Sequence, residues 1–369
     1  MSDKFYCPLP FVHQFVCADG IAMCCRPGKR HDMTIQEFED SDYLKTVRQQ
    51  LLDGAVPQEC EICQQEELRG QPSIRMQALE EYGTSQGPAL QFIDLRHDNL
   101  CNLACRMCNA GYSSLWAREV DTHPELVKFQ KPFKRNNVAD KILGDFDNLT
   151  RNLTKLSLTG GEPLLIKDHL TVLEKLIKAG RTDIELTITS NITALNPKWF
   201  EVIKQFKQVH WTVSLDEVGE YIRWPYNWTA VNNNLQTLLT LPNSIAINCT
   251  LTVYSLLNID ELVEYFLNLK PTANGPFEIW FSVAEFPPAL SVSAIPPEYR
   301  SRIKTKLEQS IEMLKLVPEH KNSIQVLASV LNTLDTTESD PKLVEQFWEY
   351  TYMLDQQRNQ NFHKTFDGE

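Results

Sequence analysis

The stretch LQFIDLRHDNLCNLACRMC, residues 90–108, joins a short β-rich run to three closely spaced cysteines. Cys101, Cys105 and Cys108 are separated by three and two residues. The run at 90–96 predicts a strand, so the cysteines follow its carboxyl end, where α/β folds place their reactive groups. A tetrahedral zinc site or an ordinary four-thiolate cluster needs four ligands. Three cysteines therefore leave one position of a metal site open.

The β-rich runs that follow this first predicted strand, and the stretches between them, predict an α/β fold. Amphipathic stretches with apolar residues three and four positions apart lie between several of them and predict helices. Strands that alternate with helices indicate parallel βαβ units. Six strands are too few for a closed eight-stranded barrel, so we expect an open, partial (β/α)6 barrel of the TIM type. The predicted strands are 90–96, 155–160, 184–190, 209–215, 245–253 and 277–283, and the clearest helices between them are 165–180, 196–206 and 259–269.

The length of 369 residues exceeds what one hydrophobic core usually supports, so we expect more than one domain. Residues 1–85 are rich in cysteine and predict a small cluster-binding domain, with one or two helices in 34–54. Residues 86–290 hold the predicted barrel. Residues 291–369 predict a C-terminal helical extension.

Charge and cysteine content narrow the class of protein. The net charge of −12 argues against a nucleic-acid partner, which usually requires a basic face. No apolar run is long enough to span a bilayer, and the N-terminus lacks the pattern of a signal peptide, so we expect a cytoplasmic protein without a membrane partner. Nine of the ten cysteines precede residue 109. In a reducing compartment, such clustering indicates metal binding or catalysis rather than disulfides.

The chemistry of three thiolates suggests a specific metal site. Cys101, Cys105 and Cys108 can hold three irons of a [4Fe–4S] cube, with the fourth iron left open for a substrate or cofactor. A zinc site completed by a fourth residue is the alternative, and His97 is close enough in sequence to complete it.

The C-x3-C-x2-C spacing, with the apolar Met107 before the third cysteine, resembles the signature of radical S-adenosylmethionine (radical SAM) enzymes. Gly160, Gly161 and Glu162, after the second predicted strand, match the GGE motif of that family. In the family, this motif meets the amino group of the methionine moiety of SAM. Glycines allow close backbone approach, and a carboxylate suits an ammonium group.

Polar residues at the ends of the next two predicted strands extend this resemblance. Ser190 and Asn191 resemble the polar pair that contacts the cofactor. Ser214 and Asp216 resemble the S-[LI]-D motif of one large branch, and Arg223 resembles an arginine that reaches the SAM carboxylate. Ser190, Asn191 and Asp216 are also residue types that cap turns and helices, and Arg223 also fits a surface cation.

The resemblance implies an oxidoreductase or peptide-modifying enzyme. A reduced [4Fe–4S] cluster passes one electron to the sulfonium of SAM, and the resulting 5′-deoxyadenosyl radical takes a hydrogen atom from the substrate. An electron donor such as flavodoxin or ferredoxin is implied. The sequence singles out no catalytic acid or second hydrogen donor, although Cys17, Cys24 and Tyr112 are available.

The N-terminal cysteines resemble the auxiliary-cluster domains called SPASM and Twitch. The pattern of cysteine, glycine, four residues, cysteine and a later pair gives Cys7, Gly20, Cys25, Cys60 and Cys63. These four cysteines imply one auxiliary [4Fe–4S] cluster, as in Twitch. Cys24 can replace Cys25 as a ligand, and zinc is the alternative to iron–sulfur. Here the cysteines precede the barrel, whereas the known domains usually follow it.

The substrate is predicted from the family alone. Relatives with auxiliary clusters often modify peptides or proteins, so we expect a peptide or protein substrate. Radical modification of a nucleotide or sugar is a second possibility, for which Trp280 and Phe281 offer stacking surfaces. A non-enzymatic metal-binding interaction module is a third, but it gives no role to the polar residues at the strand ends.

Overall fold

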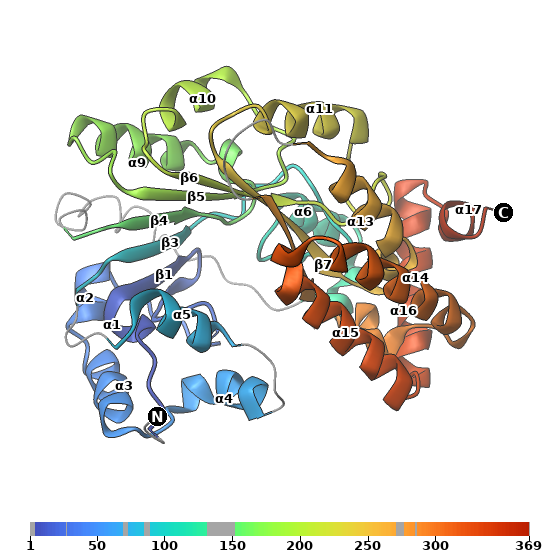
Figure 1. The fold of residues 1–369 in the computed structure, drawn as a ribbon, viewed down its shortest axis with the longest axis horizontal. Helices are drawn as coiled ribbons and strands as arrows, with labels where there is room; N and C mark the ends of the chain where they lie inside the picture. Colours follow the sequence, from blue (N-terminus) through green and yellow to red (C-terminus); the bar gives the residue numbers. More distant parts are fainter. Residues whose placement is uncertain are drawn as a thin grey trace. The chain divides into compact units, whose positions relative to one another are not determined.

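The computed structural model describes residues 4–26, 28–68, 73–84, 89–130, 152–270, 277–284 and 286–368. Backbone contacts divide the chain into two compact units. Unit 1 comprises residues 1–99, 133–188 and 198–209, and unit 2 comprises residues 100–132, 189–197 and 210–369. Figure 1 labels most of their helices (α) and strands (β); 3₁₀ helices are written η.

Unit 1 is built on strands in the order β2-β1-β3-β4-β5. β1, β3, β4 and β5 run parallel to one another, whereas β1 and β2 form an antiparallel hairpin. Buried and half-buried residues alternate along β3 and β5, as expected for strands with two different faces. The bounds are β1 His13–Cys17, β2 Gly20–Ala22, β3 Phe92–Arg96, β4 Lys155–Leu158 and β5 Glu185–Ser190.

The hairpin of β1 and β2 was not among the predicted strands. All five residues of β1 are buried, so the segment lacks the alternation that marks a half-buried strand. At the start of β2, Gly20 has φ +140°, and a Cβ atom there would lie 2.6 Å from the carbonyl oxygen of His31. Ile21 and His31 exchange backbone hydrogen bonds of 2.8 and 2.9 Å beside it. The close approach of these two backbones requires a glycine.

The helices of unit 1 follow local sequence signals. α2 begins at a capping box in which Thr34 and Glu37 satisfy each other's backbone N–H groups. α9 buries Val172, Leu173 and Leu176, which lie on one face as its apolar spacing predicts. The bounds are α1 Leu9–Val12, α2 Ile35–Glu39, α3 Asp42–Asp53, η1 Gln58–Cys60, α4 Glu61–Leu68, α5 Ile74–Tyr82, η3 Pro163–Leu165, α9 Lys167–Lys178 and α10 Pro197–Ile203.

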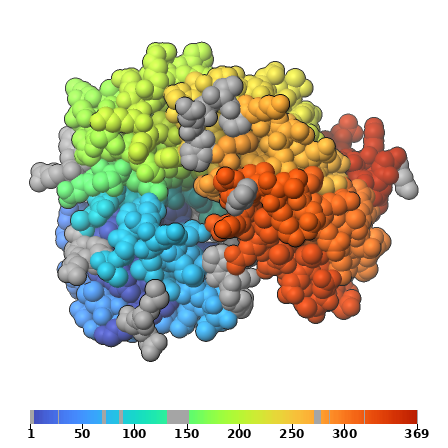
Figure 2. Space-filling model, in the orientation of Figure 1, coloured from blue at the N-terminus to red at the C-terminus, as the bar shows by residue number. Residues whose placement is uncertain are grey.

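Unit 2 contains three parallel strands and a large set of helices. β6 pairs with β7, and β7 pairs with β8. α14 packs against α12, α13 and α15, and Figure 2 shows the C-terminal helices as one continuous surface, coloured orange to red. The bounds are α6 Ser114–Thr122, η2 Pro124–Phe129, β6 Val209–Ser214, α11 Trp228–Leu238, β7 Ser244–Leu251, α12 Val253–Leu257, α13 Ile259–Asn268, β8 Phe277–Val283, η4 Pro288–Leu290, η5 Val292–Ala294, α14 Pro297–Lys315, η6 Pro318–His320, α15 Lys321–Thr336, α16 Pro341–Arg358 and α17 Phe362–Phe366.

The predicted α/β fold class is confirmed. The six predicted strands are β3 to β8, their described pairings are parallel, and the C-terminal region is helical as expected. The boundary predicted at residues 85 and 86 lies outside the described residues, and the three-domain division stays a prediction. Over the described part of the chain, no helix combines the length and apolar character needed to cross a membrane.

Candidate active site

The three-cysteine motif lies in unit 2, in the loop of residues 101–108, called the cluster loop below. Cys101 and Cys105 are buried and Cys108 is half-buried. The two buried cysteines pack with Leu103, and Met107 and Cys108 lie against that group. All three thiols of the predicted site therefore border one small apolar cluster, and Met107 serves as packing beside them.

The thiols of the cluster loop are held in a water-poor environment. Burial raises the pKa of Cys105 and Cys108 above the ordinary thiol value. Arg223 acts in the opposite direction on Cys105, because its Nη1 donates to Cys105 Sγ at 3.7 Å. A metal must displace the thiol protons to bind, and a neighbouring cation favours the thiolate that results.

Asp216 and Arg223 form a buried ion pair beside Cys105, with Oδ2 and Nη2 2.6 Å apart. Asp216 Oδ1 also accepts the backbone N–H of Thr250 at 2.7 Å. Arg223 Nε is buried and has no hydrogen-bond partner within the described ranges. Arg223 thus retains a donor for an anionic group next to the cluster loop. Because its side chain is buried, Arg223 is not a surface cation.

Ser190 and Asn191 shape the turn that follows β5. Ser190 Oγ accepts the N–H of Ile192 at 2.8 Å, and Asn191 Oδ1 accepts the N–H of Thr193 at 2.9 Å. Asn191 Nδ2 points back at the cluster loop, 4.0 Å from Cys101 Sγ. Both residues therefore cap a turn, and Asn191 in addition lies beside a predicted iron ligand.

Ser214 ends β6 and pairs in register with Asn248 of β7. Its side chain is half-buried, whereas Asp216, two residues later, is buried. Unit 2 contains the cysteines of the cluster loop and Met107, Ser190, Asn191, Ser214, Asp216 and Arg223.

The GGE motif lies in unit 1. Gly160 has φ +116°, and a Cβ atom there would lie 2.7 Å from the carbonyl oxygen of Asp98. Gly161 donates its N–H to that same oxygen at 3.0 Å. Glu162 is buried, and its Oε1 accepts the N–H of Leu164 at 3.1 Å. The two glycines let the turn approach residue 98, and the turn carries a buried carboxylate.

The N-terminal cysteines do not all lie where the sequence pattern suggests. A small cavity in unit 1 is lined by four of them, Cys7, Cys24, Cys60 and Cys63, together with Arg75 among other residues. Cys25 is exposed and does not line this cavity. Burial raises the pKa of Cys7 and Cys60 to about 12. The residue at the cavity is thus Cys24 rather than its neighbour Cys25.

The lining of this cavity is a donor set suited to a soft metal or an iron–sulfur cluster. Its volume is about 10 Å³, at the lower limit for holding one water molecule. In the described part of the chain, no group of three or more His, Cys, Asp or Glu side chains is spaced for one metal ion. Binding of a cube at this cavity would therefore have to widen it.

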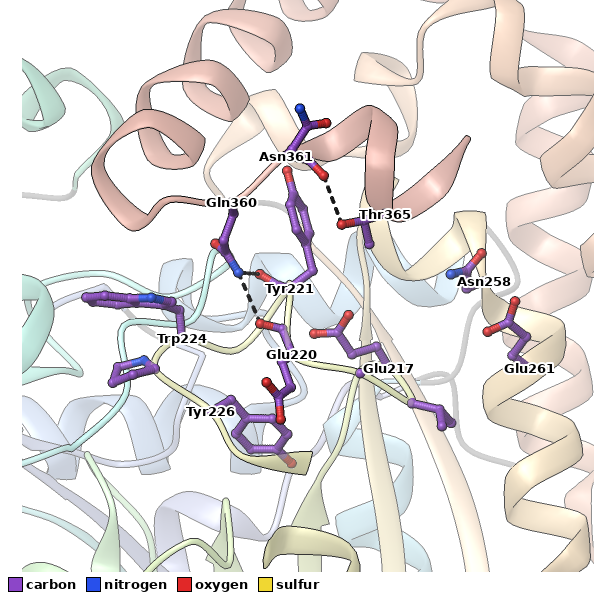
Figure 3. A pocket seen from close by; sticks show the side chains of 13 residues that line it. Glu217, Glu220, Tyr221, Trp224, Tyr226, Asn258, Glu261, Gln360, Asn361 and Thr365 are labelled. Atoms are coloured by element: carbon purple, nitrogen blue, oxygen red, sulfur yellow. Dashed lines mark hydrogen bonds between the residues drawn. The ribbon is translucent and has the colours of Figure 1, made fainter. Parts of the chain in front are cut away.

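A second cavity, of about 600 Å³, opens beside the loop that carries Asp216 and Arg223. Figure 3 shows Glu217 and Glu220 at this cavity, with Gln360 Nε2 bonded to the carbonyl oxygens of Glu220 and Tyr221 at 3.0 and 3.3 Å. Burial raises the pKa of Glu217 to about 7, although its carboxylate accepts backbone N–H groups. Glu217 was not among the predicted site residues, because one glutamate among many carries no periodic or spacing signal.

Residues 95–269 match the family model described as the Radical SAM superfamily. Residues 95–269 therefore resemble a radical SAM domain, and that family implies a [4Fe–4S] cluster and SAM as cofactors. The cysteines of the cluster loop, the unpartnered Arg223 Nε and the buried Glu162 fit these groups by their chemistry.

Curated relatives match only part of the chain. The GTP 3′,8-cyclase of Campylobacter curvus is 30% identical over 105 residues, which is 28% of this chain and 28% of that protein. Among solved structures, anSMEcpe with bound AdoMet has a TM-score of 0.46 at 15% identity, covering 63% of this chain and 61% of that chain. SuiB of Streptococcus suis, bound to its precursor peptide SuiA, has a TM-score of 0.40 at 15% identity, covering 71% and 52%.

Proposed function

We propose that this chain is a radical SAM enzyme whose Cys101, Cys105 and Cys108 hold a [4Fe–4S] cluster with one open iron. Bound there and reduced, such a cluster supplies the electron that cleaves SAM to methionine and a 5′-deoxyadenosyl radical. The observation that carries the proposal is the joint placement, within unit 2, of the three cysteines and the buried Asp216–Arg223 pair.

The chain's own residues would bind and orient these groups. The three thiols lose their protons and become iron ligands, helped at Cys105 by the neighbouring guanidinium of Arg223. Arg223 Nε is a free donor for the SAM carboxylate. Glu162 offers a carboxylate for the SAM ammonium group, and the glycines before it allow close approach.

Anaerobic reconstitution with iron and sulfide tests this proposal. The parent and a variant with Cys101, Cys105 and Cys108 changed to alanine are compared for iron content and for release of 5′-deoxyadenosine from SAM under dithionite. With a second cluster in unit 1, the parent should hold about eight irons and the variant about four, and only the parent should cleave SAM. If the triple variant keeps all of its iron, the cluster loop is not a cluster site and the proposal fails.

A second metal site in unit 1 forms part of the proposed function, with Cys7, Cys24, Cys60 and Cys63 as ligands. This set replaces Cys25 of the sequence pattern by Cys24, because Cys24 lines the cavity with the other three and Cys25 is exposed. With four protein ligands the site has no open position, so we assign it to electron transfer or structure rather than to substrate binding.

Two single variants test the ligand set of this second site. Cys24→Ala should lose the metal of unit 1, whereas Cys25→Ala should keep it. Zinc and iron are both counted: about four irons lost with Cys24→Ala indicates an auxiliary [4Fe–4S] cluster, and one zinc lost indicates a zinc site. Loss of metal from Cys25→Ala alone would reverse the assignment.

We propose a peptide or protein as substrate, on the basis of the resemblance of the N-terminal cysteines to auxiliary-cluster domains of peptide-modifying enzymes. The partial match to a GTP 3′,8-cyclase favours a nucleotide as the second candidate. Release of 5′-deoxyadenosine is measured with GTP and with a pool of random synthetic peptides. Stimulation by GTP alone would replace the peptide assignment. Flavodoxin or ferredoxin as electron donor is tested by substituting each for dithionite.

A further inference from the structure

The cluster loop contains a buried cation, Arg106. Arg106, between Cys105 and Met107, has no exposed surface. Its guanidinium lies over the ring of Tyr221, 3.8 Å from the ring centroid, and its Nε donates to the carbonyl oxygen of Tyr221 at 3.1 Å. Its Nη2 donates to Asp355 Oδ1 at the end of α16. The cluster loop is thus tied to a helix from the far end of the chain.

Asp355 connects three separate segments of unit 2 through one carboxylate. Oδ1 accepts from Arg106 of the cluster loop and from the hydroxyl of Tyr221 at 2.7 Å. Oδ2 accepts the backbone N–H of Phe362, at the start of α17, at 2.7 Å. Tyr221 belongs to residues 216–226, called the cofactor loop below, which also carries Asp216 and Arg223.

Backbone hydrogen bonds join the same two loops directly. The N–H groups of Ala104 and Arg106 donate to the carbonyl oxygens of Trp224 and Ile222 at 2.5 and 2.9 Å. From α16, the hydroxyl of Tyr350 donates to the carbonyl oxygen of Arg106 at 2.6 Å. The cluster loop therefore has one fixed register against the cofactor loop, and α16 contacts both.

A buried ion pair contributes little net stability to a fold. Desolvation of the two charges offsets much of their attraction, and apolar residues of similar size often serve stability as well or better. In some proteins such a pair instead favours one arrangement of its neighbours over others, which is the hypothesis taken for this pair. Here the neighbours are an iron-ligand loop and a loop whose Arg223 lies 3.7 Å from Cys105 Sγ.

We propose that Asp355 is a positioning residue that aligns the cofactor loop with the cluster loop, and so sets the affinity for SAM. This inference rests on the proposed function, because it assumes that the two loops bind the cluster and SAM. It gives the C-terminal extension an indirect part in the active site, through the contacts of α16 with the two loops. Misplacement of a reacting group by about 1 Å can reduce a reaction rate by about 100-fold, so small shifts of these loops have measurable effects.

The test measures SAM binding to the reconstituted, full-length protein. Asp355→Asn removes the charge and keeps the shape, and Tyr221→Phe removes one donor to Asp355 while the ion pair with Arg106 remains. Glu349→Gln is the matched control, because Glu349 also lies on α16 and its ion pair with Lys128 is exposed. The readouts are iron content, melting temperature and the SAM dissociation constant from the electron paramagnetic resonance spectrum of the reduced cluster.

We expect both variants to keep the iron of the cluster loop and to bind SAM more weakly, by about tenfold for Asp355→Asn and about threefold for Tyr221→Phe, while Glu349→Gln matches the parent. A folded, iron-loaded variant with the parent's dissociation constant would overturn the inference. If Asp355→Asn does not fold, Tyr221→Phe decides alone. A parent that binds iron but no SAM would instead refute the proposed function.

Discussion

The guanidinium of Arg223 lies 3.7 Å from the sulfur of Cys105, and its other terminal nitrogen lies 2.6 Å from the carboxylate of Asp216. A cation that touches a ligand sulfur stabilises negative charge on that ligand. Arg223 is therefore placed to influence both the loading of iron and the potential of a cluster held by Cys105. Asp216 in turn fixes the orientation of the guanidinium.

Replacement of this cation should change the redox behaviour of the site. Arg223→Gln is expected to retain the three cysteines' iron and to lower the midpoint potential of the cluster, because the reduced, more negative form loses its nearest positive charge. A redox titration followed by electron paramagnetic resonance measures this. Arg118→Gln, an exposed arginine of α6, is the control and should leave the potential unchanged. An unchanged potential in Arg223→Gln would contradict the assigned effect.

Glu217 should make stability depend on pH. Burial raises its pKa in the folded protein to about 7 from an ordinary value of 4.5, so the folded state binds the proton more tightly than the unfolded state. Stability should therefore fall as the pH rises from about 4.5 to about 7 and then level off, by at most about 3 kcal/mol from this group.

The variant Glu217→Gln removes this dependence because glutamine does not titrate. The unfolding free energy of the variant minus that of the parent should be larger at pH 8 than near pH 5. Urea unfolding at both pH values measures the difference, with Glu261→Gln, an exposed residue of the same cavity, as control. A parent and a variant with the same pH profile would show that Glu217 ionises normally.

Gly160→Ala should disrupt the GGE turn. The added Cβ would lie 2.7 Å from the carbonyl oxygen of Asp98, at a φ of +116° that other residues rarely adopt. We expect a loss of about 1–3 kcal/mol in stability and weaker SAM binding. Gly180→Ala is the matched control, since Gly180 also has a positive φ, of +74°, but open space around its Cβ position. Equal losses in both variants would mean that the contact with Asp98 contributes nothing.

Trp116→Phe should affect the cluster loop selectively. Trp116 Nε1 donates to the carbonyl oxygen of Cys105 at 2.8 Å, and the side chain is fully buried. Trp199 makes the same kind of bond in unit 1, to the carbonyl oxygen of Leu164 at 3.0 Å. Both Trp→Phe variants should lose about 1–2 kcal/mol of stability. Only Trp116→Phe should also lose iron faster from the cysteines on exposure to air, as followed by visible absorbance; equal rates would contradict this.

Local sequence patterns were sufficient to predict many of the strands and helices. Each of β3 to β8 corresponds to a predicted β-rich run, and α9, α13 and the C-terminal helices correspond to segments with helical spacing. These signals are local because a strand or helix that buries one face repeats its apolar residues at a fixed period. β1 was missed for the same reason, since five consecutive buried residues have no such period.

Neighbouring residues alone specify β3 to β8, the amphipathic helices named above and the cysteine spacing of the cluster loop, because each of these is a local pattern. Tertiary structure alone decided which side chains meet. Cys24 and Cys25 are adjacent, and only the path of the chain after β2 turns one into the cavity and leaves the other exposed. Arg106 and Asp355 are separated by 249 positions, and only folding removes both charges from water and forces them to pair.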